Sequence, residues 1–380
     1  MSEAPLPDIT LPDELRPGDG RFGSGPSKVR PEAVAALAEV ASSFLGTSHR
    51  QKGVKSVVAR VKRGVADLLG LPDGYEVVLG NGGSTLFWDV ATLCLIEHRS
   101  QHLVFGEFSS KFAAAAKAAP FLDDPEVIES EYGSHPEAKA TPDVDAYALT
   151  HNETSTGVMM TVERPSGTTA GDGLVLVDAT SAAGGLRVDA SQFDVYYFAP
   201  QKALASDGGL WLAAMSPAAI ERVGRLVPHR WVPAVLDLQQ AIDNSRLDQT
   251  LNTPALATLF LVAQQLDWLE SSGGIDFAAG RCDRSASIVY GWADASPYAS
   301  PFVSDAAMRS HTVATVDLDP SVDAATVAKV LRNNGIVDTE SYRKLGRNQL
   351  RLAMFPAIEP DDLERLTKAI DFIAERIATS

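Results

Sequence analysis

Apolar and polar positions follow two different rhythms along the first two thirds of the chain. In residues 31–45 and 57–69, apolar side chains recur every three or four positions, which predicts two amphipathic helices. Short apolar runs typical of buried strands occur at 76–79, 103–105, 126–128, 146–149, 174–177 and 195–198. Helical segments separate several of these runs. Strands that alternate with helices predict an α/β fold whose mostly parallel sheet is covered by helices on both faces.

The pattern changes after a long amphipathic stretch at 254–269. Beyond it the sequence predicts helices and strands in turn, at 277–292, 312–316, 324–333, 349–354 and 361–377. The last helix carries Asp361 and Asp362 in its first turn, where carboxylates complement the helix dipole. We therefore expect an N-terminal arm at 1–16, a large domain at 17–270 and a smaller α+β domain at 271–380.

Composition limits the classes of function. A chain of 380 residues with 45% hydrophobic content can bury a large core and a smaller one. The net charge of -16 argues against general affinity for nucleic acid or for an anionic membrane. Cys94 and Cys282 give neither a disulfide framework nor a metal spacing, so we expect no metal site. The first twenty residues lack the regions of a signal peptide, and we expect a cytoplasmic protein.

The position of one lysine between two predicted core elements suggests a chemical role for its amine. Lys202 falls in a polar connection between the apolar run at 195–198 and another that begins at 208. Asp178 follows the run at 174–177, at the carboxyl end of a strand, where open α/β sheets bind ligands. A lysine that can capture an aldehyde and a carboxylate that can keep a pyridine nitrogen protonated suit pyridoxal phosphate. Taken singly, a surface lysine and a helix-capping aspartate remain the simpler interpretation.

A glycine-rich turn at 80–85 precedes a predicted helix. Ser84 and Thr85 open that helix, whose free amides and hydroxyls can bind a phosphate. The segment lacks the lysine of a nucleotide P-loop and the spacing of a dinucleotide site. The phosphate of another cofactor is the better hypothesis, and a simple strand-to-helix turn is the alternative.

Two basic clusters stand out in this acidic chain, at 48–52 and at 342–351. Arg351 lies between Leu350 and Leu352, on a strand that the apolar pattern places in the core. Because a planar guanidinium binds a carboxylate through two hydrogen bonds, Arg351 is a candidate anchor for an amino-acid carboxylate. The clusters as a whole could attract a substrate with two or three negative charges, although most basic runs are solvated surface.

In combination, these segments resemble the phosphoserine aminotransferases, and most closely the actinobacterial branch of that class V family. The resemblance covers nearly the whole chain. It is carried, in chain order, by Ser-His-Arg at 48–50, Asn-Gly-Gly-Ser-Thr at 81–85, His-Asn-Glu-Thr at 151–154, Val-Asp-Ala-Thr-Ser at 177–181, Gln-Lys at 201–202, Asn-Thr-Pro at 252–254 and Arg351. It implies a fold type I transferase that depends on pyridoxal 5'-phosphate.

The resemblance also implies roles for cofactor-binding residues. Lys202 would bind the cofactor covalently and act as the general base, and Asp178 would pair with the pyridine nitrogen. Phe108 stands where many relatives have a tryptophan stacked on the ring. The remaining contacts would come from Ser84, Thr85 and Gln201 at the phosphate, from Thr154 near the ring hydroxyl, and from Asn252 and Thr253 at the phosphate of the neighbouring subunit. The active unit would therefore be a homodimer with shared active sites.

On the substrate side, the resemblance assigns the α-carboxylate to Arg351. His49 and Arg50 would receive the side-chain carboxylate of glutamate or the phosphate of phosphoserine, and Arg343 is a further candidate for the phosphate. The segment around Arg343 departs from the family pattern, so Lys344 and Arg347 stay open as alternatives. The implied reaction is reversible amino transfer between L-glutamate and 3-phosphohydroxypyruvate, which gives O-phospho-L-serine and 2-oxoglutarate in serine biosynthesis. Bacterial relatives also act on 4-phosphohydroxythreonine in pyridoxine biosynthesis.

Three other functions would be compatible with part of this sequence pattern. Another class V aminotransferase, acting on glyoxylate or pyruvate, would share most of these motifs. A cysteine desulfurase needs a cysteine in a mobile loop, and neither Cys94 nor Cys282 is predicted in one. A relative that serves only as a scaffold would have no reason to keep Lys202, Asp178 and Arg351 together.

Overall fold

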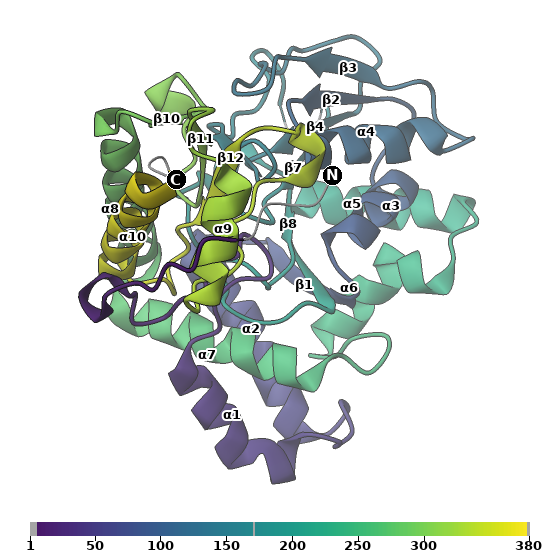
Figure 1. Cartoon of the computed structure of the whole chain (residues 1–380). Coiled ribbons are helices and arrows are strands. Elements are labelled where there is room, and N and C mark those ends of the chain that lie inside the picture. Colours follow the sequence, from purple (N-terminus) through teal and green to yellow (C-terminus); the bar gives the residue numbers. More distant parts are fainter. Residues whose placement is uncertain (1–5, 170–171, 378–380) are drawn as a thin grey trace.

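A seven-stranded sheet forms the centre of the molecule, as the computed structural model of residues 6–169 and 172–377 shows (Figure 1). Its order is β1-β9-β8-β7-β4-β2-β3, and only β9 runs against the other strands. The strands are β1 (Glu76–Asn81), β2 (Ser100–Val104), β3 (Glu126–Glu129), β4 (Ala146–Thr150), β7 (Leu174–Asp178), β8 (Val195–Phe198) and β9 (Leu210–Met215). This sheet confirms the predicted α/β fold.

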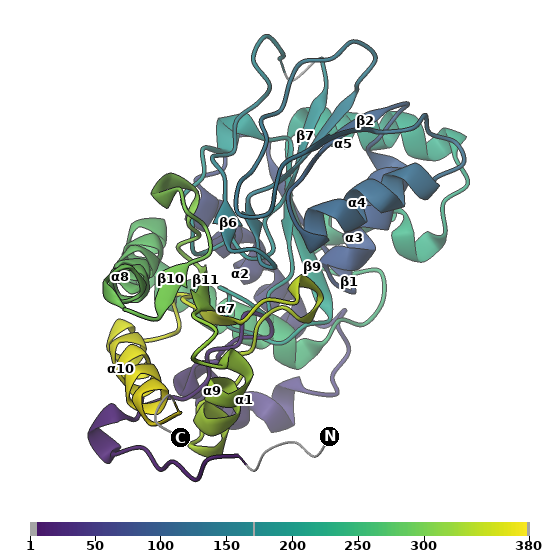
Figure 2. The ribbon, with the colours of Figure 1, turned by 45° about the horizontal axis from the view of Figure 1, so that its top comes forward.

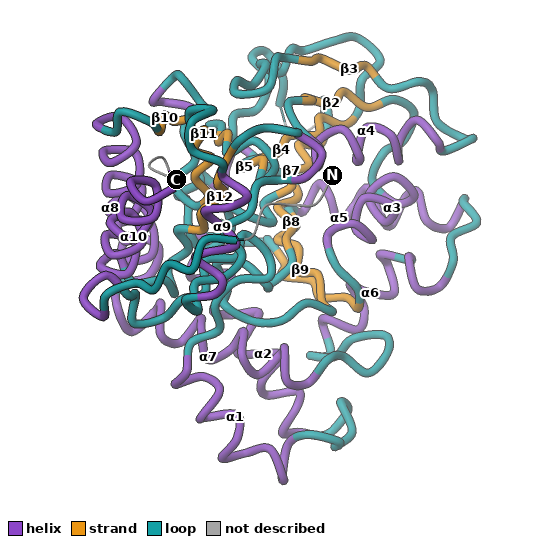
Figure 3. The backbone as a smooth tube through the Cα atoms, in the orientation of Figure 1, coloured by secondary structure: helices purple, strands orange, loops and turns teal. Residues whose placement is uncertain are grey.

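Helices cover both faces of the sheet, which is why its strands read as continuous apolar runs. Successive residues of β1 show the arrangement, because Val77 and Leu79 join one core and Val78 joins the other. The first core is covered by α1 (Pro31–Phe44), α2 (Lys52–Leu69) and α7 (Leu256–Ser272). The second is covered by α3 (Ser84–Cys94), α4 (Glu107–Ala118), α5 (Pro217–Leu226) and α6 (Leu238–Arg246). Figure 3 shows the strands as a band between these helices.

Helix α2 begins five residues before the expected start at 57. Its first turn contains exposed Lys52 and Gly53, buried Val54 and half-buried Lys55, so one apolar position alone marks it in the sequence. The hydrophobic pattern therefore detects the buried part of this helix and misses its polar beginning.

A second, three-stranded antiparallel sheet lies in the C-terminal part of the chain. It consists of β10 (Ala299–Pro301), β11 (Val313–Leu318) and β12 (Gln349–Ala353) and packs against α8 (Gly274–Ala295), α9 (Ala324–Asn333) and α10 (Pro360–Ile377). Leu11 and Phe22 join the same core, and Phe22 N donates to Val337 O at 3.3 Å. The N-terminal segment therefore packs along the C-terminal sheet and its helices (Figure 2). The domain boundaries stay predictions, and residues 1–5 of the expected arm lie outside the described residues.

Short elements complete the fold and position the site. A hairpin of β5 (Asn152–Glu153) and β6 (Val158–Met159) follows directly after β4. Six 3-10 turns occur in the described residues: η1 (Asp13–Leu15), η2 (Ala190–Gln192), η3 (Val227–His229), η4 (Ala234–Leu236), η5 (Ala306–Met308) and η6 (Arg343–Leu345). Within the described ranges, every helix is too short or too polar to span a lipid bilayer.

Candidate active site

Lys202 and Asp178 lie in the wall of one cavity of about 270 Å³. Asp178 is the last residue of β7, and Lys202 follows the adjacent strand β8, so both stand at the carboxyl edge of the sheet. The backbone at Gly25 passes so close that an added Cβ would be 2.7 Å from Lys202 Cε. A side chain at position 25 would therefore displace the lysine.

The amine of Lys202 is buried, and its environment favours the neutral form. Burial lowers the pKa of Lys202 to about 8; Asp178 and Glu153 raise it in part, while Arg351 lowers it further. Lys202 Nζ donates a hydrogen bond of 2.6 Å to Thr154 Oγ1. A lysine with so low a pKa has an appreciable neutral fraction near physiological pH and can act as a nucleophile or a base.

Asp178 is a buried carboxylate held by neutral donors. Its Oδ2 accepts from Trp88 Nε1 at 3.0 Å, and its Oδ1 accepts from Thr180 N at 3.0 Å. No ion pair of Asp178 occurs within the described residues. Burial without a cationic partner is costly, so this carboxylate is prepared to meet a positively charged group in the cavity.

A chain of hydroxyls connects Asp178 to the start of α3. Thr180 Oγ1 lies 2.6 Å from both Asp178 Oδ1 and Ser84 Oγ. Because a carboxylate can only accept, Thr180 donates to Asp178 and receives the hydrogen of Ser84. Ser84 and Thr85 form the first turn of α3, where amides without intrahelical partners favour an anion. Gln201 Oε1, also at the cavity, is buried and has no hydrogen-bond partner in the part of the chain that the structure describes.

Arg351 enters the cavity from β12, beside two aromatic rings. Its guanidinium lies 5.4 Å from the centre of the Tyr342 ring, which lies 6.0 Å from the Phe108 ring. Burial lowers the pKa of Arg351, although not enough to discharge a guanidinium. Arg351 Nε is buried and has no hydrogen-bond partner among the described residues. An unmet donor on a buried cation is suited to a carboxylate ligand. The centre of the Phe108 ring also lies 5.4 Å from Lys202 Nζ, so Phe108 stands between Tyr342 and the lysine.

Five of the sequence-predicted residues do not line this cavity: Arg343, and an outer cluster of His49, Arg50, Asn252 and Thr253. Thr253 Oγ1 lies 3.2 Å from His49 Nδ1, and Thr253 O accepts from Asn81 Nδ2 at 3.0 Å. Arg50, Asn252 and Thr253 are exposed. The structure thus brings these motifs together without placing them at Lys202 of the same chain.

The three basic residues at 343–347 differ in their partners. Lys344 pairs with Glu107 on α4, and Arg347 pairs with Asp317. Arg343 is exposed, and the structure of the described ranges gives it no ionic partner. Of the three, Arg343 is the cation that is not already neutralised.

Sequence reasoning missed several residues of the cavity wall: Ser24, Gly25, Gly83, Trp88, Thr150, Asn152, Thr180 and Tyr342. Trp88 lies on an apolar helix, where an aromatic residue is more often core. Asn152 and Thr180 belong to motifs quoted above, and their positions beside Thr154 and Asp178 were the available signal. Ser24 and Gly25 are distant in sequence from the other residues, and no local pattern marks them.

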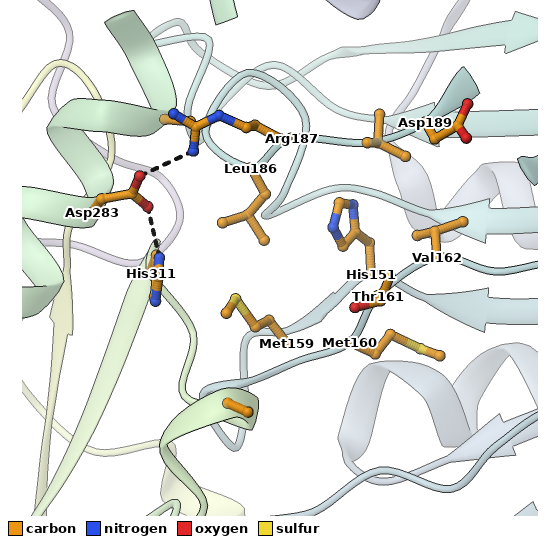
Figure 4. Close-up of a pocket in the computed structure, with 13 residues that line it drawn as sticks. His151, Met159, Met160, Thr161, Val162, Leu186, Arg187, Asp189, Asp283 and His311 are labelled. Atoms are coloured by element: carbon orange, nitrogen blue, oxygen red, sulfur yellow. Dashed lines mark hydrogen bonds and ion pairs between the residues drawn. The ribbon is translucent and has the colours of Figure 1, made fainter. Parts of the chain in front are cut away.

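A second cavity, of about 460 Å³, lies beside the hairpin of β5 and β6 (Figure 4). Three of its titratable groups pair with one another, since Asp283 accepts from Arg187 at 3.0 Å and from His311 at 2.7 Å, whereas Asp189 accepts from Ser191 N at 2.9 Å. Burial lowers the pKa of His151, at its wall, to about 4, so this imidazole is neutral. Although larger, this cavity lacks an amine and a carboxylate that are both buried and open to a ligand.

The family model for aminotransferase class-V matches residues 22–339. The chain is 58% identical to a phosphoserine aminotransferase of Nocardioides sp. over 97% of this chain and 99% of that protein. It is also 58% identical to the one of Rhodococcus jostii, over 99% of this chain and the whole of that protein.

Solved structures agree on the fold. The phosphoserine aminotransferase of Cytophaga hutchinsonii superimposes with a TM-score of 0.85 at 23% identity, over 93% of this chain and 99% of that one. A pyridoxal-phosphate-bound phosphoserine aminotransferase from Trichomonas vaginalis gives 0.77 at 17% identity, over 93% and 99%. The resemblance inferred from the motifs is confirmed, and the chain belongs to the class V aminotransferases.

Proposed function

We propose that this protein is a phosphoserine aminotransferase. It transfers an amino group reversibly between L-glutamate and 3-phosphohydroxypyruvate, giving O-phospho-L-serine and 2-oxoglutarate. The observation that carries the proposal is that Lys202, Asp178 and Arg351 line the same cavity. The high identity to actinobacterial phosphoserine aminotransferases supports this choice of substrate within the family.

The residues of the cavity fit pyridoxal 5'-phosphate. Among the described residues, Asp178 is a buried carboxylate without a paired cation, and Gln201 Oε1 and Arg351 Nε are buried without hydrogen-bond partners. When bound, this cofactor supplies an aldehyde for amines and a ring that withdraws electrons from the substrate α-carbon. Lys202 would hold the aldehyde, Asp178 would keep a proton at the ring nitrogen, and Ser84 and Thr85 at the start of α3 would hold the phosphate.

Each chain residue then has a defined task in the transfer. The neutral amine of Lys202 would act as the general base and acid that moves a proton to or from the substrate α-carbon. Thr154 orients this amine through the 2.6 Å hydrogen bond. Phe108 covers one side of the cavity and excludes water there. Arg351 orients both amino acids through the α-carboxylate they share, and Arg343 is the available cation for the phosphate.

We further propose a homodimer with shared active sites. The outer cluster of His49, Arg50, Asn252 and Thr253 carries polar groups that the cavity of the same chain does not use. Close to this cluster in sequence, Leu45 and Leu247 are 38% and 59% exposed. Exposed apolar side chains beside unused polar groups favour a surface that a second copy covers. The cluster then completes the cavity of the neighbouring subunit.

An assay of purified protein with different keto acids tests the proposed function. With glutamate as donor, we expect 3-phosphohydroxypyruvate to be converted at least about a hundredfold more efficiently than glyoxylate or pyruvate. Preference for glyoxylate or pyruvate would instead indicate another class V aminotransferase. Inclusion of the 2-keto acid derived from 4-phosphohydroxythreonine tests a contribution to pyridoxine biosynthesis.

A further inference from the structure

The hairpin strand β5 and the turn after it present side chains alternately to two sides. Asn152 Nδ2 and Thr154 Oγ1 both lie 2.8 Å from Ser181 Oγ, on the side of the cavity. Glu153 and Ser155 point the other way, toward the start of α4. This alternation follows from extended backbone, in which successive side chains project to opposite faces.

The carboxylate of Glu153 is fully buried and is bound by neutral donors. Its Oε2 accepts from Phe108 N at 3.1 Å and from Ser109 N at 2.9 Å, and its Oε1 accepts from Ser155 Oγ at 2.7 Å. Ser155 Oγ in turn accepts from Glu107 N at 3.0 Å. The first three amides of α4, which a helix leaves without internal partners, are therefore all bound by Glu153 and Ser155.

The contact is close enough to exclude any side chain at position 106. A Cβ on Gly106 would lie 2.3 Å from Glu153 Cγ and 2.4 Å from Cδ. The φ angle of Gly106 is 178°, which is extended backbone that any residue adopts. The glycine is thus required by the packed carboxylate and not by the conformation of its own backbone.

We propose that Glu153 is a positioning residue that fixes the Phe108 ring relative to Thr154 and Lys202. Through the backbone amide of Phe108 it holds the aromatic side of the cavity, and through its neighbour Thr154 it is tied to the lysine side. The inference rests on the proposed function in one respect, namely that Phe108 covers the ring of a bound cofactor.

A carboxylate suits this task better than an amide. All of its partners donate, so both oxygens of Glu153 are used, whereas glutamine would turn an NH₂ group toward one set of donors. The charge also matters, because, against the burial that lowers the pKa of Lys202, the charges of Asp178 and Glu153 raise it, while that of Arg351 lowers it further. Loss of the Glu153 charge leaves one carboxylate opposed by one cation.

The test is Glu153→Gln, examined first as protein freed of cofactor. Acetylation of Lys202 is followed by peptide mass spectrometry at increasing pH, which gives the apparent pKa of the amine. We expect this pKa to fall below its value in the unaltered protein, because one negative charge near the ammonium is lost. We also expect pyridoxal phosphate to bind about tenfold more weakly or worse, since the Phe108 ring is no longer held.

Asp323→Ala is the matched control. Asp323 caps α9 by accepting from Thr326 N at 2.8 Å and does not line the cavity, so its loss should lower the unfolding temperature only. If Glu153→Gln likewise lowered the unfolding temperature but left the Lys202 titration and cofactor affinity unchanged, the proposal would be overturned.

A second variant guards against failure of Glu153→Gln to fold. Gly106→Ala keeps the carboxylate but pushes it from its place, and should also weaken cofactor binding. Normal cofactor affinity in Gly106→Ala would overturn the proposal. Because the Lys202 titration needs neither cofactor nor substrate, its outcome is separate from that of the amino-transfer assay.

Discussion

At the scale of single residues, burial changes the chemistry of two cations. Lys202 keeps a hydrogen bond to Thr154 but loses water, and its pKa falls to about 8. Arg351 stays charged, and its Nε finds no hydrogen-bond partner within residues 6–169 and 172–377. A buried amine with a lowered pKa and a buried guanidinium N–H without a partner both cost free energy. A ligand that bonds to these two groups removes that cost. Such features are typical of a binding site rather than of a structural ion pair.

The depressed pKa of Lys202 predicts the pH dependence of cofactor capture. Only the neutral amine attacks an aldehyde, so the capture rate should rise with pH and level off above about 8. Stopped-flow absorbance of cofactor-free protein mixed with pyridoxal phosphate measures this rate. A rate that kept rising toward the ordinary pKa of lysine would show that the amine is not perturbed.

Arg351→Ala tests the anchor for the α-carboxylate. We expect KM to rise by about tenfold to a hundredfold for glutamate and for phosphoserine alike, because both present the same group. Arg351→Lys is the matched variant, since it keeps the charge but loses the planar fork, and it should recover only part of the loss. An effect on one donor alone would assign Arg351 to a different part of the substrate.

At the scale of elements, the ends of strands meet the starts of helices. β7 ends at Asp178, and Thr180 connects it to Ser84 at the start of α3. The sequence predicted these elements because each has a strong apolar run next to a polar terminus. It could not predict Ser24 or Tyr342, since their approach to the cavity depends on contacts between distant segments that leave no local periodicity.

Thr180→Val should break the connection between Asp178 and Ser84. The variant keeps the shape of the side chain but removes the hydroxyl, so Ser84 and Asp178 each lose a partner. We expect about tenfold weaker binding of pyridoxal phosphate, as for the loss of one buried hydrogen bond to a charged group. Thr180→Ser should bind normally in an equilibrium titration. Equal affinity of the valine variant and the unaltered protein would argue against the connection.

At the scale of the whole molecule, the predicted site residues other than Arg343 divide into two groups. The cavity takes Ser84, Thr85, Phe108, Thr154, Asp178, Gln201, Lys202 and Arg351, whereas the outer cluster takes His49, Arg50, Asn252 and Thr253. Motif order along a chain identifies the family but carries no distances. The resemblance had assigned Asn252 and Thr253 to the neighbouring subunit, and the structure adds that His49 lies beside Thr253, outside the cavity. This division is the basis for the proposed dimer.

Complementation between two inactive variants tests the shared site. Lys202→Ala should inactivate the cavity, and the double change of Asn252 and Thr253 to alanine should inactivate the outer cluster. If each site uses both chains, mixing the two proteins under conditions that exchange subunits should restore about a quarter of normal activity, because hybrids regain one complete site. No recovery after verified exchange would show that each chain builds its site alone.

The central claim is that the Lys202 amine holds pyridoxal phosphate opposite Asp178. Borohydride reduction of the protein with bound cofactor, followed by peptide mass spectrometry, tests it most directly. The account predicts that the added cofactor mass is found on the peptide that contains Lys202 and is absent in Lys202→Ala. Cofactor mass on another lysine, or none at all in protein that transfers amino groups, would contradict the account.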